Sequence, residues 1–473
     1  MEIQSNRPLA IPSWVLMDQI FLYDDPGSFR IDDEASAVAE DTNGEPVRVS
    51  FNLHSPPGSS NLCIYGPAER KPSFWDTVVA AHDNTVLFRI EVHFDGLPFT
   101  HLYAMDYFIY RAFSSSAPKL SLLPRCYSTY DEIMEGGGVD ASWRGKWRMV
   151  DSNSIGLLLA GEEDIVVAEL KIDCWTAAYN QAAPLEAELF RIRSSSNGGG
   201  QWELTPTASR DGKVRFQDIL GWETHKVVPF TTYLCWADYN RGVLFCNVCN
   251  KVPDLQYLQF PGNVPSIGSP KLFRTVCVTD SGKTMKFVNV VRSRRDGILS
   301  CPNCKRPCDN CRQCSGFTIS FWTLKVKNND MDWVDEVVIR ADDLWAMEGY
   351  DDELPDFVPQ FPLVSMEDPH ILYFVLSNLP CPHGQEKTWI VTLDMVNKKI
   401  LRYDDDKALP SDNIFNGIGF FPSNFSNYLT MHSQANLILQ LQSLWMFMVV
   451  VGWKPQVAEL RSARTDPFVP KQL

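Results

Sequence analysis

The sequence lacks the short motifs that identify most enzyme families. It contains no G-x-G-x-x-G, H-E-x-x-H or G-x-S-x-G segment, and its eight histidines are scattered with no recognisable nucleophile motif. Gly282-Lys283-Thr284 looks like the end of a phosphate-binding loop, but Cys277 stands where the first glycine of that loop is required. We therefore expect no catalytic residues. Because catalytic triads assemble from distant positions, an unrecognised hydrolase stays open as an alternative.

Positive charge and long apolar runs are also scarce. The chain has 43 Lys and Arg against 58 Asp and Glu, a formal net charge of −15. A chain this acidic repels nucleic acid and anionic membrane surfaces, so we expect neither as a partner. Residues 1–12 lack the apolar core of a secretory signal, and the apolar run Leu444–Trp453 is too short to span a bilayer. We expect an intracellular protein, cytoplasmic or nuclear.

The composition favours a large folded body rich in strands. Hydrophobic residues make up 45% and aromatic residues 12% of 473 positions, enough for a sizeable core. Runs with the alternation or apolar content of strands recur along the chain. They are Val47–Leu53, Thr85–Val92, Ile155–Leu159, Ile165–Ile172, Val243–Val248, Thr284–Val291, Phe317–Val326, Ile371–Leu376 and Thr388–Leu393. Short strands at this spacing predict an all-β fold.

A weak internal repeat favours a propeller over a two-sheet sandwich. Asp106–Tyr110 is followed by Pro118–Pro124, and Trp236–Phe245 is followed by Pro253–Pro261. Both copies show an aromatic strand, a break and a short strand that ends in proline. A repeated unit of this size fits a blade that buries its faces against its neighbours. We therefore predict a mainly β, β-propeller-like repeat of short antiparallel strands with few short helices.

One body is expected from residue 12 to residue 420. Its N-terminal part covers 12–235, and 236–420 forms a core segment with a Cys-rich insertion at 292–316. Residues 421–473 differ in character and form an atypical tail. Arg340–Met347 is a candidate short helix, and the acidic stretch Glu348–Asp356 that follows it is expected to be a solvated loop rather than a cation site.

The cysteine cluster is the sharpest local feature. Cys-x-x-Cys lets two sulfurs turn towards one metal ion, and two such pairs can supply a tetrahedral zinc site. The proposed ligands are Cys301, Cys304, Cys308 and Cys311, with Cys314 as an alternative ligand. Only three residues separate the two pairs, less than in most zinc ribbons, so a surface loop of free thiols stays open as the alternative. Zinc is thus the one cofactor that the sequence suggests.

A second Cys-x-x-Cys, Cys246–Cys249, is expected to belong to the core. It overlaps the end of the apolar run Val243–Val248, and strand alternation would place its two thiols on opposite faces.

Several motifs, taken in their order along the chain, carry a family resemblance. They are Pro12–Asp18, Asp106–Tyr110 with the stretch to Pro124, Leu234–Asp238, Gly242–Cys246, Phe321–Leu324 through Trp333, Asp343–Trp345, Tyr350, Leu354-Pro355 and Pro359. This arrangement resembles a plant family known as domain of unknown function 1618. The resemblance covers residues 12 to 420, and the tail lies outside it. Cys249 departs from the bulky apolar residue expected there.

The resemblance implies a binding protein. The W-T-L…W pattern is similar to that of F-box-associated and kelch-like propeller domains, which recognise protein partners. An F-box itself is not expected, because the 13 residues before Trp14 are too few for that helical domain. The sequence therefore favours a non-catalytic protein-interaction scaffold with an unknown protein partner. A zinc-binding regulatory protein is the first alternative, and the hydrolase is the second.

Overall fold

Strands account for most of the folded chain, and they follow the period-two patterns of the sequence. The computed structural model describes residues 11–31, 35–65, 73, 75–92, 104–112, 117–127, 153–161, 164–172, 187–194, 200–209, 214, 216–264, 269–280, 282–294, 315–327, 330–377, 388–405 and 420–429. The predicted runs Thr85–Val92, Ile155–Leu159 and Ile165–Ile172 coincide with strands. Alternation is a local property, so it locates single strands well.

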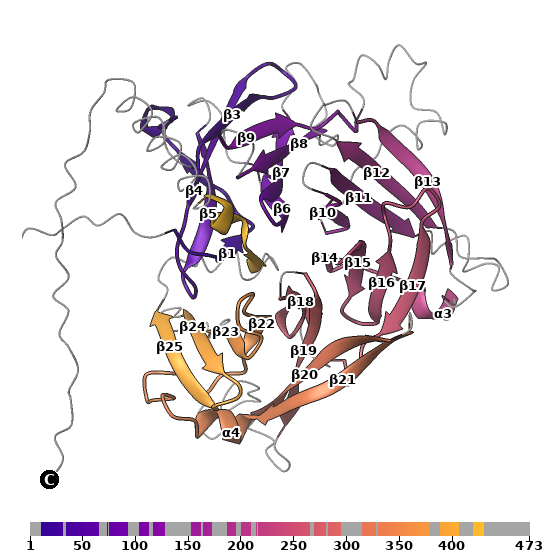
Figure 1. The fold of residues 1–473 in the computed structure, drawn as a ribbon. Coiled ribbons are helices and arrows are strands. Elements are labelled where there is room, and N and C mark those ends of the chain that lie inside the picture. The colour runs from indigo at the N-terminus through magenta and orange to yellow at the C-terminus, as the bar shows by residue number, and fades with distance from the viewer. Residues whose placement is uncertain are drawn as a thin grey trace, which may run out of the picture. The chain divides into compact units, whose positions relative to one another are not determined.

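The strands form six blades of a β-propeller around a common axis (Figure 1). Five blades contain four antiparallel strands each, in chain order from the axis outward. They are β6 (Thr77–His82), β7 (Thr85–Val92), β8 (Ala104–Arg111), β9 (Lys119–Leu122); β10 (Ile155–Leu159), β11 (Ile165–Ile172), β12 (Ala187–Ser194), β13 (Trp202–Ser209); β14 (Lys226–Phe230), β15 (Tyr233–Asp238), β16 (Gly242–Cys246), β17 (Asp254–Gln259); β18 (Arg274–Thr279), β19 (Thr284–Arg294), β20 (Ser315–Lys327), β21 (Asp330–Arg340); β22 (Gln360–Val364), β23 (Ile371–Ser377), β24 (Thr388–Asp394), β25 (Lys399–Asp405).

The sixth blade combines strands from both ends of the described chain. Its sheet has the order β26-β1-β5-β4-β3, and β2 pairs with β5. These strands are β1 (Val15–Asp18), β2 (Leu22–Asp24), β3 (Ala37–Glu40), β4 (Pro46–Asn52), β5 (Ser59–Tyr65) and β26 (Phe420–Ser423). Because β26 pairs antiparallel with β1, the ring of blades is closed by backbone hydrogen bonds.

Two neighbouring blades are also joined at their outer edges. β13 and β17 pair in parallel, with Ala208 opposite Asp254 and Ser209 opposite Leu255, so the two blades share one eight-stranded sheet. The helices with both ends in the described part of the chain are short: η1 (Pro26–Ser28), α3 (Phe216–Ile219), η4 (Pro270–Leu272) and α4 (Ala341–Trp345). Residues 425–429 are also helical. The predicted helix at Arg340–Met347 is confirmed as α4. Among these residues, no helix is long and apolar enough to cross a membrane.

The hydrophobic core lies between blades rather than inside any one of them. β20 shows how alternation produces this arrangement. Phe317, Ile319 and Phe321 pack in the cluster shared with the blade β22–β25, whereas Trp322 and Leu324 pack in the cluster shared with the blade β14–β17. Both faces of the strand are therefore buried, and a blade is stable only with its neighbours.

The internal repeat corresponds to equivalent parts of two blades. Asp106–Tyr110 lies in β8 and the segment after it in β9. In the second copy, Trp236–Asp238 lies in β15, Gly242–Phe245 in β16, and the segment after them in β17. Both copies thus contain the third and fourth strands of a blade, and the second copy also contains part of the second strand. The predicted propeller is confirmed, and the sandwich alternative is wrong because the sheets surround an axis instead of facing each other in pairs.

The C-terminal boundary of the propeller lies beyond residue 420. The chain divides into a compact unit that ends at Thr430 and a second unit, Met431–Leu473. Phe425 is fully buried in the core between the sixth blade and the blade β6–β9, where its ring centroid lies 4.5 Å from that of Phe51. The residues up to 429 are thus part of the folded body.

Candidate functional site

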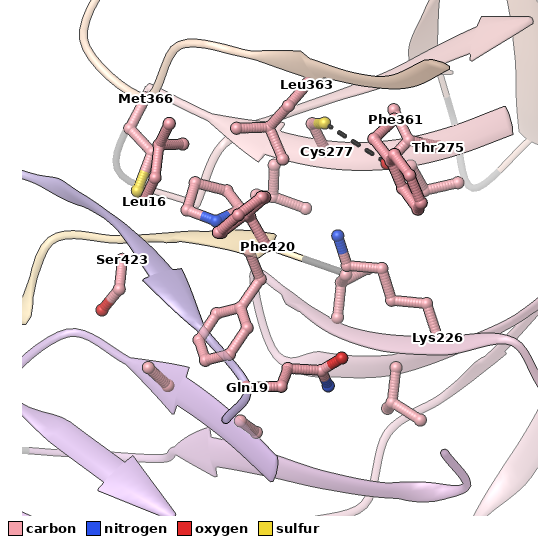
Figure 2. Close-up of a pocket in the computed structure, with 18 of the residues that line it drawn as sticks. Leu16, Gln19, Lys226, Thr275, Cys277, Phe361, Leu363, Met366, Phe420 and Ser423 are labelled. Atoms are coloured by element: carbon pink, nitrogen blue, oxygen red, sulfur yellow. Dashed lines mark hydrogen bonds between the residues drawn. The ribbon is translucent and has the colours of Figure 1, made fainter. Parts of the chain in front are cut away.

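A pocket of about 190 Å³ lies on the axis of the propeller. The innermost strand of every blade contributes to its walls, from Ala81 of β6 and Ile155 of β10 to Phe420 of β26. Figure 2 shows apolar side chains over much of this lining, among them Leu363 and Met366. Enclosed apolar pockets with a few polar groups are the usual places for ligands to bind.

Lys226 is the most unusual side chain of the pocket. It is the first residue of β14, and Figure 2 shows its ammonium group in the space between Gln19 and Cys277. Burial lowers the pKa of Lys226, and interaction with Cys277 opposes this shift. No salt bridge or hydrogen bond of its Nζ atom to any described residue is present. A cation enclosed in this way loses hydration without gaining a counter-charge.

Two further cations lie at the end of the pocket where β14 and β18 begin. Lys271, on η4, donates a hydrogen bond to Asn153 Oδ1 at 3.4 Å. Arg274, the first residue of β18, donates to Asn289 Oδ1 at 3.0 Å and to the carbonyls of Tyr239 and Asn263. Burial lowers the pKa of Arg274 to about 10, which leaves it charged at neutral pH. We call Lys226, Lys271 and Arg274 the basic end.

The two histidines of the pocket are held as neutral rings. His82 Nδ1 accepts a hydrogen bond from the backbone N–H of Leu159 at 2.9 Å, and His225 Nδ1 accepts one from that of Tyr239 at 3.2 Å. Burial lowers the pKa of both imidazoles. The accepting role of Nδ1 places the ring proton on Nε2. The hydrogen-bond donors that orient both rings are therefore backbone N–H groups and not the side chain of a nucleophile.

Acidic groups near the pocket are already engaged. Asp83 accepts a hydrogen bond from Asn424 Nδ2 at 3.3 Å. Asp238 is fully buried and forms a salt bridge with Arg241 at 3.0 Å. Its carboxylate also accepts hydrogen bonds from the backbone N–H groups of Glu223 and Asn240. These contacts fix loops between strands, and they leave the basic end as the dominant charge in the pocket.

Cys277 is the thiol that faces Lys226. It lies in β18, is 1% exposed, and its sulfur accepts a hydrogen bond from the backbone N–H of Val364 at 3.5 Å. The thiol and the hydroxyl of Thr275 are 3.8 Å apart. In the sequence, Cys277 stands where the first glycine of a phosphate-binding loop is required.

The predicted zinc ligands lie outside the described residues. This holds for all five cysteines from Cys301 to Cys314, so their geometry stays a prediction. Within the described ranges, no three His, Cys, Asp or Glu side chains converge as a metal site would require.

Cys246 and Cys249 belong to the core, as predicted, but the placement on opposite strand faces is wrong. β16 ends at Cys246, and Cys249 lies in the turn that follows it. Cys246 is a member of the core cluster between the blades β10–β13 and β14–β17, and Cys249 packs against that same cluster. Alternation ceases where the strand ends, which explains the difference.

The acidic loop after α4 is exposed, as expected. Tyr403 donates its hydroxyl hydrogen bond towards Asp351 Oδ2 at 2.8 Å and Glu353 Oε2 at 3.2 Å, and Lys399 pairs with Glu348. The loop is therefore tied to the edge strand β25 by its own contacts.

The basic end was missed by the sequence analysis. In the sequence, His225-Lys226 is an ordinary polar start to an apolar strand, and Lys271 and Arg274 flank a short break. A lysine followed by an apolar run carries no local sign that its side chain will be enclosed. Only an assignment of β14 as an innermost strand would have identified it.

Comparisons with known proteins assign no activity to this chain. Residues 236–373 match the family described as "Protein of unknown function (DUF1618)". No curated protein sequence matches the chain. Among solved structures, the chain is similar to hydrazine synthase of Kuenenia stuttgartiensis, with 10% identity, a TM-score of 0.30, and coverage of 84% of this chain and 80% of that one. A hypothetical selenium-binding protein of Sulfolobus tokodaii shows 9% identity, a TM-score of 0.26, and coverage of 71% and 82%.

Proposed function

We propose that this chain is a non-catalytic protein-interaction scaffold that takes one residue of its partner into the axial pocket. The observation that carries this proposal is the pocket itself, which is enclosed by the innermost strands of all six blades and is largely apolar. Recognition sites of this kind bind through an apolar body and a few polar groups. The loops around the mouth of a propeller add a wider contact surface.

The chemistry of the pocket supports binding over catalysis. A general base must reach the proton that it removes, and a nucleophile needs such a base beside it. His82 and His225 instead use Nδ1 to accept backbone N–H groups, and burial favours their neutral forms. Lys226 has no hydrogen-bonded partner among the described residues that would take part in proton transfer.

Affinity capture with blocked variants tests this function. Ala81 lines the pocket, so Ala81→Phe would fill it, and Met366→Trp would fill it from another wall. Val396→Phe adds similar bulk at an exposed site and serves as the control. Each protein would be immobilised in an extract of the cells that express it, and the retained proteins identified by mass spectrometry.

The expected result is at least one protein retained by the parent and by Val396→Phe and lost from both blocked variants. Circular dichroism would establish that all four proteins are folded. The same proteins retained by folded blocked variants would reject the proposal.

Zinc binding by Cys301, Cys304, Cys308 and Cys311 is a second candidate function, in which the metal orders the insertion for regulation. The paired Cys-x-x-Cys spacing of the sequence supports it.

A further inference from the structure

The ammonium group of Lys226 has no salt-bridge or hydrogen-bond partner among the residues that the structure describes. Cys277 is the titratable neighbour that acts on it, and burial lowers the pKa of this lysine. The nearby carboxylate of Asp238 is engaged with Arg241. Retaining an enclosed cation without a partner is costly, and the cost disappears when an occupant brings the opposite charge.

We propose that the pocket binds a carboxylate attached to an apolar residue, and that Lys226 forms the ion pair with it. This inference rests on the proposed function and names the part of the partner that enters the pocket. The basic end adds a positive field around the same position, since Arg274 is held by neutral acceptors and keeps its charge. The protein has a formal net charge of −15 and repels anions as a whole, but the local positive field of the basic end attracts an anion into the pocket.

The remaining walls indicate what the carboxylate is attached to. Phe361, Leu363 and Phe420 present apolar surface in the pocket with Lys226 (Figure 2). An inorganic anion would leave this surface uncovered. An apolar residue that carries a carboxylate satisfies both the ammonium and the walls.

The carboxyl-terminal residue of a partner chain has this chemistry. Its α-carboxylate and its apolar side chain belong to one residue, which suits a pocket of about 190 Å³. An internal Asp or Glu has its charge at the tip of a side chain with one or two methylenes. It would also bring two flanking chain segments to a space enclosed by six strands, so we assign the occupant as a chain terminus.

The test compares the affinity of the protein for a carboxylic acid with its affinity for the corresponding neutral amide. N-acetylphenylalanine represents an apolar C-terminal residue, N-acetylphenylalaninamide lacks only the charge, and N-acetylglutamate α-amide represents an internal acidic residue. Calorimetric titration would be carried out on the full chain and on its Lys226→Met and Lys226→Arg variants. Lys251→Met, at an exposed lysine, is the matched control.

We expect the parent and Lys251→Met to bind the acid about tenfold or more tightly than the amide. Lys226→Met should lose this preference, Lys226→Arg should keep part of it, and the glutamate probe should bind more weakly than the acid. Equal affinity for acid and amide, a preference that survives in Lys226→Met, or no saturable binding of the acid by the folded parent would overturn the proposal. Tighter binding of the glutamate probe would overturn the assignment to a chain terminus.

Failure of this inference is distinguishable from failure of the proposed function. If Lys226→Met still captures the proteins that Ala81→Phe loses, the pocket binds a partner but not through a carboxylate. If Ala81→Phe captures them as well, the proposed function itself fails.

Discussion

Val15 of β1 lies directly opposite Ser423 of β26 in an antiparallel pair. Met17 faces Phe421 in the same register, so residues near the two ends of the described chain share one sheet. This pairing closes the ring of blades. The pairing covers the inner edge of β1. Trp14, which directly precedes β1, is buried, and its ring packs edge-on against Tyr373 with the centroids 5.4 Å apart.

The closure predicts different effects for two C-terminal truncations. A chain that ends at Thr430 retains β26 and Phe425, and its thermal unfolding should match that of the full chain. A chain that ends at residue 419 loses both, which exposes the inner edge of β1 and opens the core around Phe51. Loss of Phe425 alone is expected to cost about 3–5 kcal/mol, the usual range for a buried phenylalanine. Calorimetric melting of the three proteins checks this, and equal melting temperatures would contradict it.

Gly242 should not tolerate a side chain. It lies at the start of β16, and a Cβ atom there would approach the carbonyl oxygen of Leu258 to 2.2 Å. Because that oxygen belongs to the backbone of the paired strand, β17 would have to move. We expect Gly242→Ala to lower the free energy of unfolding by about 1–3 kcal/mol. Gly161→Ala is the control, since an added Cβ there has no neighbour within 4 Å. Urea titration of both variants decides the matter, and similar midpoints would show the clash to be harmless.

Lys226→Met should stabilise the folded protein at neutral pH. The folded state lowers the pKa of Lys226, so between this lowered value and the ordinary value of about 10.4 the unfolded chain binds more protons. Stability of the parent therefore rises with pH across that window. The gain from Lys226→Met is full below the folded pKa, decreases through the window and vanishes above it. A gain of about 1 kcal/mol is the scale expected for a half-buried ammonium group that has no hydrogen-bond partner among the described residues.

Denaturant titration at a series of pH values measures this gain. The other ionisable residues that line the pocket are unchanged in the variant, so the difference between parent and variant isolates Lys226. They are His82, Asp83, His225, Tyr239, Lys271, Arg274, Cys277 and Tyr373. Lys251→Met should show no comparable change. A variant less stable than the parent at pH 7 would mean that the ammonium is compensated in the folded state.

The cysteine insertion predicts bound zinc. Protein purified without added metal should contain about one zinc per chain if Cys301, Cys304, Cys308 and Cys311 form a tetrahedral site. Changing these four cysteines to serine should abolish the metal, whereas changing Cys246 and Cys249 to serine should not. Elemental analysis provides the measurement. Equal zinc in the parent and the four-cysteine variant, or none in the parent, would leave a loop of free thiols.

The sequence by itself determined the strands and the class of fold. Thr85–Val92 and Ile165–Ile172 were located to the residue, because alternation and apolar content reflect how a single strand is buried. The predicted run Val243–Val248 was too long by contrast, since β16 ends at Cys246 and apolar residues continue into the turn. The repeated strand pairs β8–β9 and β16–β17 indicated blades, because each blade buries its two faces against neighbouring blades and so requires a similar sequence pattern.

Only the tertiary structure decided which strands face the axis, and therefore where the pocket lies. Leu16, Lys226, Phe361 and Phe420 come from three blades and carry no common pattern in the sequence. They meet because the pairing of β1 with β26 closes the ring, and the closed ring places the innermost strand of each blade around the axis. The enclosure of Lys226 is a property of that ring. A strand pattern describes how one segment is buried, but it contains no information about which distant segments surround it.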